Sequence, residues 1–353
     1  MMRIHSRPLC GVLLVAAALA GCAPASPATG PYGIVDTIHV GGGGHWDYLS
    51  YDPAGHRLYA SHNGHVEVVD ARTGTHVGSI AVRGFSHATA VDREHNRGFI
   101  TVGTSSFAPG AEAHEVAVFD LETLQVVRHI DMPSDPDGIA YEPISKRIVA
   151  FTGDSHSAVV IDPARERIVK TVDLHATPGS AVFDGRGHLF VSLENPADVL
   201  ELDSSSFALV RRLHVPGCRK PVGVAVSAAT DHLFVACRNR SLAVMNLRDG
   251  TLVASVPIAR HNDAAAFDPV TRTLFVSTLD GTLSIVRDEG NDRFRLVQNL
   301  TTFPGSRTLA LDPVTHRVYM SYAKLAPLPL GAMRYPDPIG GTFALLVVAE
   351  ARR

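Results

Sequence analysis

Tryptophan and cysteine are scarce in this sequence, and neither sign of charge is in large excess. No familiar enzyme motif is recognisable in it. The 353 residues include one tryptophan, Trp46, and four cysteines. Lys and Arg number 32 against 35 Asp and Glu, a formal net charge of −3. Nucleic-acid-binding proteins carry clustered basic surface, so we expect no nucleic-acid partner. The chain lacks a Gly-x-Ser-x-Gly elbow, a His-Glu-x-x-His pair, a phosphate loop and a dinucleotide fingerprint, and so indicates no common catalytic class.

The first apolar run of the chain has the features of an export signal. It covers residues 9–19, follows Arg3 and Arg7, and is shorter than the roughly 20 residues that span a bilayer. It closes with Leu-Ala-Gly-Cys at 19–22, which resembles the bacterial lipobox. That resemblance implies a signal peptide at 1–21, a lipid on Cys22, and a lipidated Cys and flexible tether at 22–32. The alternative is an ordinary signal with a chance cysteine. In the lipoprotein signals that this segment resembles, the residue after the cysteine directs sorting. Ala23 at that position favours the periplasmic side of the outer membrane.

A repeat occupies the remainder of the chain, residues 33–353. Its unit is an apolar strand that usually ends in an acid, a polar turn, a strand with an aromatic centre in most units, and further strands of alternating polarity. The first strands end at residues 52, 92, 142, 184, 227, 268 and 312. Period-two alternation between turn residues predicts strands, and four antiparallel strands repeated every 40–50 residues are typical of a propeller blade. We therefore predict an all-β fold, a seven-bladed β-propeller with four antiparallel strands per blade.

The seventh unit lacks a fourth strand, whereas an unassigned strand-like segment lies at residues 33–40. Exposed strand edges are a liability in soluble proteins. We therefore expect this N-terminal strand to complete the last blade and close the ring.

The repeats resemble those of a known family. Pro-Asp-Gly-Ile-Ala-Tyr at 136–141 and Pro-Val-Gly-Val-Ala-Val at 221–226 look like YVTN-type (YncE-like) propeller repeats. The resemblance implies the propeller fold and no particular activity, because such folds carry many functions. Trp-Asp repeats and the tryptophan-rich repeats of quinone-dependent dehydrogenases fit less well, since Trp46 stands alone.

Two cysteines remain after the signal region. Cys218 precedes the first strand of the fifth unit, and Cys237 ends the adjacent second strand. Antiparallel pairing of these strands would bring the two residues to about the 5.5 Å Cα separation of a disulfide. We predict a disulfide, as suits an oxidising compartment, with two buried thiols as the alternative.

A ring of ionisable residues is predicted at one end of the central channel, which we call the top. Stepping back five residues from each first-strand end gives Asp47, His87, Asp137, Gly179, Val222, Asp263 and Arg307. The long loops 103–114 and 323–341 belong to the same end by strand parity, and long loops on a rigid scaffold often carry function. The predicted ligand-binding residues are Trp46, Asp47, His62, His87, Asp137, Glu194, Arg238, Asp263 and Arg307, with Tyr335 as a further apolar wall. A solvated rim of Asp turn caps is the alternative.

Two functions follow from this ring. The first is a binding scaffold that docks a small molecule, a peptide or a protein on the top face. The second is a metal-dependent hydrolase or lyase, in which Asp47, Asp137 and Asp263 hold a divalent cation and His87 is the general base. Carboxylate oxygens suit Ca²⁺ or Mg²⁺. The binding scaffold is preferred, because no catalytic constellation is recognisable from the spacing.

Overall fold

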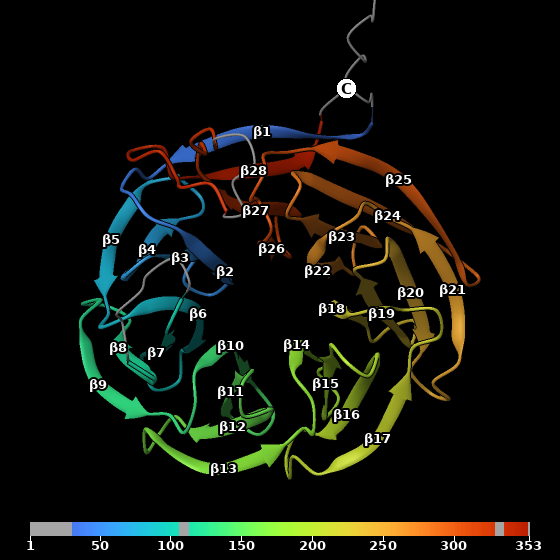
Figure 1. Cartoon of the computed structure of the whole chain (residues 1–353), viewed down its shortest axis with the longest axis horizontal. Coiled ribbons are helices and arrows are strands. Elements are labelled where there is room, and N and C mark those ends of the chain that lie inside the picture. Colours follow the sequence, from blue (N-terminus) through green and yellow to red (C-terminus); the bar gives the residue numbers. More distant parts are fainter. Residues whose placement is uncertain (1–29, 106–112, 329–334, 352–353) are drawn as a thin grey trace, which may run out of the picture.

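A ring of seven four-stranded sheets forms the molecule, as the repeat predicts. The computed structural model describes residues 30–105, 113–328 and 335–351, so Cys22 and parts of the long loops 103–114 and 323–341 lie outside the described residues. The described part contains 28 strands and no helix, and hence no helix that could cross a membrane. Figure 1 shows the sheets standing as blades around a central axis. The prediction of a seven-bladed β-propeller is confirmed.

Each blade begins at the channel and runs outward. The innermost strands are β2 (Trp46–Asp52), β6 (Phe85–Asp92), β10 (Pro136–Glu142), β14 (Pro178–Phe183), β18 (Pro221–Ser227), β22 (Asn262–Asp268) and β26 (Leu309–Asp312). The second strands are β3 (Arg57–His62), β7 (Arg97–Gly103), β11 (Arg147–Thr152), β15 (His188–Leu193), β19 (His232–Cys237), β23 (Thr273–Thr278) and β27 (Arg317–Tyr322).

The two remaining positions of each blade lie toward the rim. The third strands are β4 (His65–Asp70), β8 (Glu115–Asp120), β12 (Ser157–Asp162), β16 (Asp198–Asp203), β20 (Ser241–Asn246), β24 (Thr282–Gly290) and β28 (Ala344–Glu350). The outermost strands are β5 (His76–Ala81), β9 (Val126–Asp131), β13 (Arg167–Asp173), β17 (Leu209–His214), β21 (Leu252–Pro257), β25 (Arg293–Thr301) and β1 (Tyr32–His39).

The N-terminal strand closes the ring, as predicted. β1 pairs antiparallel with β28, from Tyr32 opposite Glu350 to His39 opposite Ala344. The strand covers residues 32–39, one position earlier than the predicted 33–40. The Ala351 N–H donates to the Pro31 carbonyl at 2.6 Å. Blade seven therefore joins two distant parts of the chain, and its edge is covered by the first described strand (Figure 1).

The hydrophobic core lies between blades. Every cluster of buried side chains combines two neighbouring sheets; Tyr59 and Ile80 of the first blade, for example, pack with Ile100 and Phe119 of the second. The aromatic centres of the second strands are almost wholly buried, among them Phe99, Phe190, Phe234, Phe275 and Tyr319. Because the blades stabilise one another through these layers, the inner strands are held firmly around the channel.

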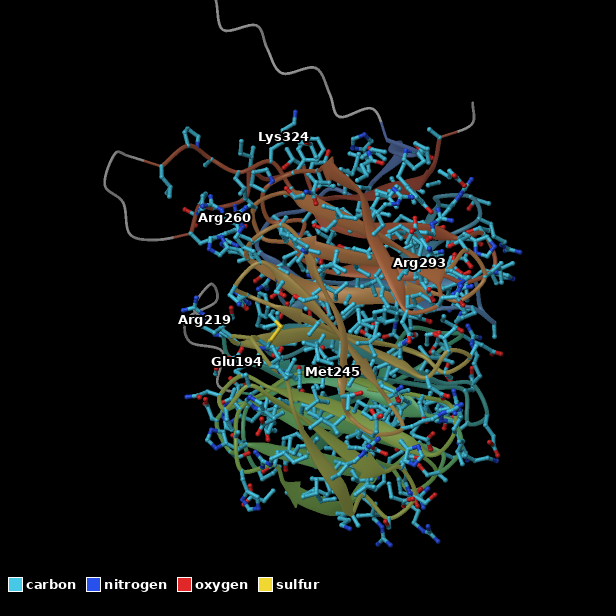
Figure 2. The ribbon with its side chains drawn as sticks, turned by 90° about the vertical axis from the view of Figure 1, so that its right-hand side faces the viewer. Glu194, Arg219, Met245, Arg260, Arg293 and Lys324 are labelled. Atoms are coloured by element: carbon cyan, nitrogen blue, oxygen red, sulfur yellow. A yellow bond between two sulfur atoms is a disulfide. The ribbon has the colours of Figure 1, made fainter. Side chains whose placement is uncertain are left out.

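The predicted disulfide is present. Cys218 and Cys237 are bonded, with Cα atoms 5.4 Å apart. Figure 2 shows the bond in yellow near Arg219, toward the side of the ring that carries Glu194 and Arg260 and away from Arg293. Disulfides persist in oxidising compartments, so the bond indicates a protein that works outside the cytoplasm.

Candidate functional site

β-Bulges explain why the ring residues face the channel. In β2 the pairing shifts from Trp46–His62 to Leu49–Ala60, so that Asp47 and Tyr48 together oppose one residue of β3. The same irregularity surrounds each of the other five bulged ring positions, His87, Asp137, Gly179, Val222 and Asp263. A bulge redirects a side chain out of the regular alternation. Arg307 lies two residues before β26 and completes the ring.

Hydroxyl side chains tie several of these bulges to the next blade. Thr101 Oγ1, opposite the bulge of β6, accepts a hydrogen bond from the Ala88 N–H at 3.0 Å and donates to the Asp137 carbonyl at 2.5 Å. Ser192 accepts from the Ser180 N–H at 2.9 Å and donates to the Val222 carbonyl at 2.9 Å. Ser277 likewise donates to the Arg307 carbonyl. In each of these three cases, a side chain of the preceding blade fixes the backbone of a ring residue.

A cavity opens at the ring. It has a volume of about 340 Å³ and is lined by Asp47, Tyr48, Asp137, Pro178, Gly179, Ser180, Ala181, Glu194, Val222, Val224, Arg238, Asp263, Ala264, Ala265, Arg307 and Leu309. A second cavity of about 320 Å³ lies toward His87, Thr104 and Asp154, and shares Asp47, Asp137 and Arg307 with the first. Both volumes fall at the lower end of the range of small-molecule sites. The innermost strands of blades four and five contribute small or apolar walls, whereas the ring residues of the other five blades are ionisable.

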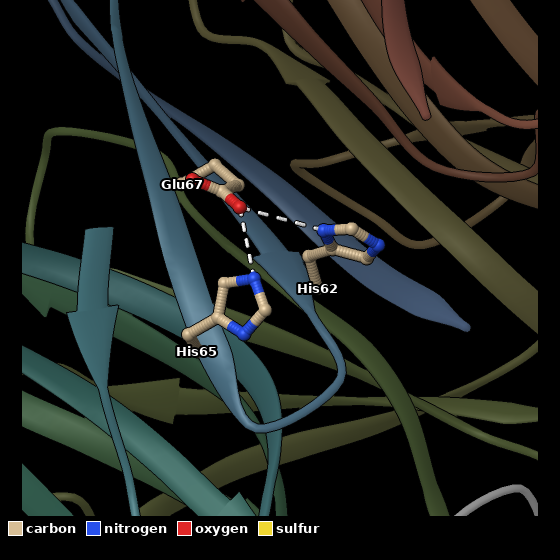
Figure 3. A group of neighbouring side chains, drawn as sticks. All are labelled: His62, His65 and Glu67. Atoms are coloured by element: carbon tan, nitrogen blue, oxygen red, sulfur yellow. Dashed lines mark hydrogen bonds and ion pairs between the residues drawn. The ribbon is translucent and has the colours of Figure 1, made fainter. Parts of the chain in front are cut away.

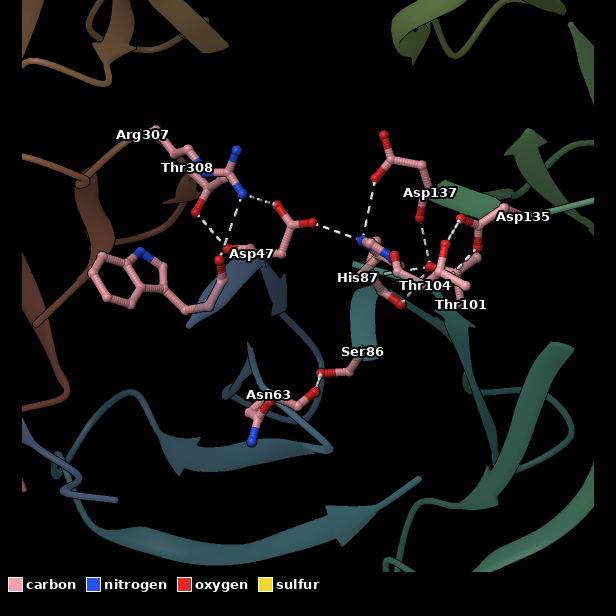
Figure 4. A network of polar contacts seen from close by, with 12 residues as sticks. Asp47, Asn63, Ser86, His87, Thr101, Thr104, Asp135, Asp137, Arg307 and Thr308 are labelled. Atoms are coloured by element: carbon pink, nitrogen blue, oxygen red, sulfur yellow. Dashed lines mark hydrogen bonds and ion pairs between the residues drawn. The ribbon is translucent and has the colours of Figure 1, made fainter. Parts of the chain in front are cut away.

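Asp47 is the centre of a charged network in this mouth. Its side chain is 10% exposed. One oxygen accepts from Arg307 Nη2 at 2.9 Å and the other from His87 Nδ1 at 2.8 Å. Figure 4 shows Asp47 between these two cations, with Asp137 on the far side of His87. Two positive charges therefore compensate the most buried carboxylate of the ring.

His87 is held in its doubly protonated form. Its Nδ1 lies against the Asp47 carboxylate and its Nε2 lies 3.2 Å from the Thr104 carbonyl oxygen, so both ring nitrogens face acceptors. Burial by itself lowers the pKa of His87, but the hydrogen bond to Asp47 and the charges of Asp47 and Asp137 outweigh it and raise the pKa to about 9. At neutral pH this residue is a cation and a hydrogen-bond donor.

Among the three ring carboxylates, Asp137 is the most exposed. Its side chain is 51% exposed, and Oδ1 lies 3.6 Å from His87 Nδ1, whose proton already points at Asp47. Enclosure in the mouth and the negative charge of Asp47 raise the pKa of Asp137 to about 6, although His87 and Arg307 act in the opposite direction. The negative charge of Asp137, together with burial, also raises the pKa of Tyr48 well above its usual value.

The other predicted acids of the site have cationic partners. Asp263 Oδ1 lies 2.9 Å from Arg238 Nη2, and Glu194 Oε2 lies 2.9 Å from Lys220 Nζ. Burial raises the pKa of Asp263, while Arg307 and Arg238 oppose that rise. Asp263, Glu194 and Arg238 line the larger cavity, so the structure brings them together with the ring.

Two predicted residues lie elsewhere. The Trp46 indole is buried and donates from Nε1 to the Gly305 carbonyl at 3.1 Å, beside a small cavity of about 50 Å³ that it shares with Arg307 and Tyr335. His62 is fully buried under Phe343 and lines neither channel cavity, because its side chain points between the first and seventh blades.

Sequence reasoning missed Tyr48 and the bridging hydroxyls. Tyr48 is the second residue of the bulge in β2, and regular alternation would turn it away from the direction of Asp47. The sequence does carry a signal for these hydroxyls, since Ser or Thr recurs two residues after the aromatic centre of most second strands, at Ser61, Thr101, Ser192, Ser277 and Ser321. Of these five, Thr101, Ser192 and Ser277 make the hydrogen bonds to the next blade.

Comparison with known proteins supports the fold. No family model matches the chain, and no curated protein matches it by sequence. A solved structure of Kuenenia stuttgartiensis hydrazine synthase is similar, with a TM-score of 0.65 and 19% identity over 85% of this chain and 95% of that one. The structure of U3-55K is similar with a TM-score of 0.69 and 9% identity, over 88% of this chain and 97% of that one. At these identities the likeness shows a shared propeller architecture and no shared activity.

Proposed function

We propose that this chain is an exported β-propeller of the YVTN-type (YncE-like) group, anchored through lipid on Cys22, which binds a ligand in its top-face cavity. The observation that carries the binding role is the mouth of the channel. Six bulges and Arg307 direct the ring residues toward two adjoining cavities that share Asp47, Asp137 and Arg307. The buried charges there are paired, and Asp137 remains half exposed. Preorganised polar groups of this kind, beside apolar walls, are the usual features of a small-ligand site.

The charge distribution suggests which ligand chemistry fits. Asp137 can accept hydrogen bonds from an ammonium, amidinium or hydroxyl group, because its nearest cation, His87, is already engaged by Asp47. The walls that blades four and five contribute, with Ala181 and Val222, suit a short apolar portion. We therefore expect a small, hydrogen-bond-donating ligand or an amine-bearing side chain of a peptide.

The hydrolase or lyase alternative needs Asp47, Asp137 and Asp263 as metal ligands and His87 as the base. Among the described residues, Asp47 and Asp137 lie with His87 in a group whose ligand atoms are within 4.8 Å of one another, and Asp263 is not part of that group. The donor set fits a divalent cation poorly. Asp47 is bracketed by Arg307 and His87, Asp263 is paired with Arg238, and a doubly protonated His87 can neither bind a metal nor accept a proton as a base.

Thermal shift assays distinguish the two functions. We expect agmatine or putrescine to raise the melting temperature of the wild type and to lose this effect in Asp137→Asn, whereas Ca²⁺, Mg²⁺ and Mn²⁺ leave both unchanged. Asp173→Asn is the matched control, because that aspartate is exposed on the outermost strand β13. Stabilisation by a divalent cation that Asp137→Asn abolishes would favour the hydrolase. Mass spectrometry of molecules that co-purify from the native host would identify the natural ligand.

The membrane anchor has a separate test. The wild type should require detergent for release and should carry a diacylglycerol mass on Cys22, while Cys22→Ala should stay unprocessed or become soluble. Release of the wild type by a buffer wash alone would contradict the lipid anchor and leave the binding site unaffected.

A further inference from the structure

A second cluster of metal-binding side chains lies in the first blade, away from the channel. Glu67 of β4 is buried, with a side chain 7% exposed, and three imidazoles approach its carboxylate. His65 Nε2 lies 2.8 Å from Oε1, His76 Nε2 lies 2.7 Å from Oε2, and His62 Nδ1 lies 3.5 Å from Oε1. Three imidazoles thus surround one buried carboxylate.

The hairpin β3–β4 explains why these side chains converge. His62 pairs directly with His65 across the turn, and Glu67 follows His65 by two residues on the same face of the strand. On the other side of β4, Ser79 of β5 pairs with Glu67 and donates to Oε2 at 2.5 Å. Figure 3 shows the rings of His62 and His65 turned toward the same carboxylate from the two strands of the hairpin.

His62 supplies an independent reason to expect a ligand. Its side chain is fully buried, and neither ring nitrogen makes a hydrogen bond in the described part of the chain. Buried polar atoms without partners are costly and often mark the place of an ion or water. Coordination through Nδ1 would give that nitrogen a bond.

Packing fixes the orientation of the His62 ring. The ring stacks on Phe343 with centroids 4.0 Å apart and planes at 18°. Gly42 also lies against the ring; its φ is +84°, and an added Cβ would come 2.8 Å from His62 Cε1. A clamped ring whose free nitrogen points at a carboxylate is a preorganised ligand.

We propose that His62, His65 and Glu67 form a binding site for a zinc-type transition-metal ion. Zinc–ligand bonds of about 2.0–2.1 Å in a tetrahedron place ligand atoms about 3.3 Å apart. The observed separations of 3.5 Å and 2.8 Å are close to this value, and the three ligand atoms lie within 4.8 Å of one another. Two imidazoles and a carboxylate suit Zn²⁺, whereas Ca²⁺ and Mg²⁺ prefer oxygen ligands alone.

His76 and Ser79 act on the second carboxylate oxygen. Both contact Oε2, so they hold Glu67 with Oε1 directed at the two other imidazoles. Such outer partners orient a ligand without binding the metal themselves. The side chains of His65 and His76 are 30% and 42% exposed, which gives an ion a route from solvent.

Calorimetric titration with ZnCl₂ tests the site in the full chain, expressed without a histidine tag and treated with EDTA. We expect one tight site per chain. His65→Ala should weaken its affinity by about 100-fold or more, and His76→Ala by roughly tenfold, since removing an outer partner typically costs 10–100-fold. Bound Co²⁺ should show the intense visible absorption of a tetrahedral complex in the wild type and lose it in Glu67→Gln.

The second blade offers a matched control. His129 Nδ1 lies 2.8 Å from Glu115 Oε1, with side-chain exposures of 27% and 6%, but among the described residues no second imidazole joins this pair to make a three-ligand group. His129→Ala should therefore leave Zn²⁺ binding unchanged. No tight Zn²⁺ site in the wild type, or an affinity that His65→Ala does not alter, would overturn the proposal. If Glu67→Gln fails to fold, the Zn²⁺ affinity of His65→Ala tests the site instead, because His65 is partly exposed.

Discussion

The positive charge of His87 should make the stability of the propeller depend on pH. The pKa of this histidine moves from 6.5 in an unfolded chain to about 9 in the fold. Each pKa unit is worth about 1.4 kcal/mol, so the difference contributes about 3 kcal/mol to the free energy of unfolding. Solvent screening reduces this figure little, because the side chain is 12% exposed. Since the pKa is raised, the contribution is fully present below pH 6.5 and is lost as the pH rises through 9.

Urea unfolding between pH 6 and 10 measures this loss. The wild type should become less stable by about 3 kcal/mol across the window relative to His87→Gln, whose neutral amide has no proton to release. His175→Gln is the control, because His175 is 72% exposed and its partner Asp173 is exposed too. Parallel pH profiles for the wild type and His87→Gln would refute the charged state of His87 and, with it, the reason for rejecting it as a base.

Three further perturbations test other parts of the structure. Cys218→Ser should lower the free energy of unfolding by about 3 kcal/mol, because the bond closes a loop of 19 residues. Two titratable thiols in the mature wild type, denatured but not reduced, would exclude the bond. Deleting residues 32–39 should expose the edge of β28 and replace one cooperative melting transition by aggregation, whereas melting like the wild type would show that β1 is dispensable. Asp137→Asn should stabilise the protein at pH 8 but not at pH 3. The pKa of Asp137 is raised to about 6 in the fold, so folding disfavours the charged carboxylate, which predominates above that pH. Equal effects of the substitution at both pH values would contradict a raised pKa.

The fold was predictable because strands, turns and their repetition are local properties of the chain. Alternation of polar and apolar residues between acid-bearing turns predicted each blade, and the one unit short of a strand predicted the closure by residues 33–40. The disulfide followed from the same pairing, since Cys218 and Cys237 stand at adjoining strand ends.

The candidate site was less accessible because it depends on contacts between blades. A fixed count from each first-strand end located the ring, since nearly every inner strand carries its bulge at the same place. The ion pairs of the site could not be predicted from sequence spacing, because their partners lie far apart in the chain. Arg307 and Asp47, for example, are 260 positions apart and belong to neighbouring blades. His62 was expected at the mouth, but its partner across the hairpin is His65, and the pair faces the seventh blade.

The closure by β1 also sets the order in which the molecule can be completed. Six blades are made of consecutive segments, so their hairpins can form as soon as each segment is available. The seventh needs residues 32 and 350 to meet, which is the longest loop that this fold has to close. Contacts of such sequence separation slow folding and leave strand edges exposed while they are missing. Joining β1 to β28 is therefore the step that completes the seventh sheet and closes the ring, and any chain that stops before β28 carries an unpaired strand at its beginning.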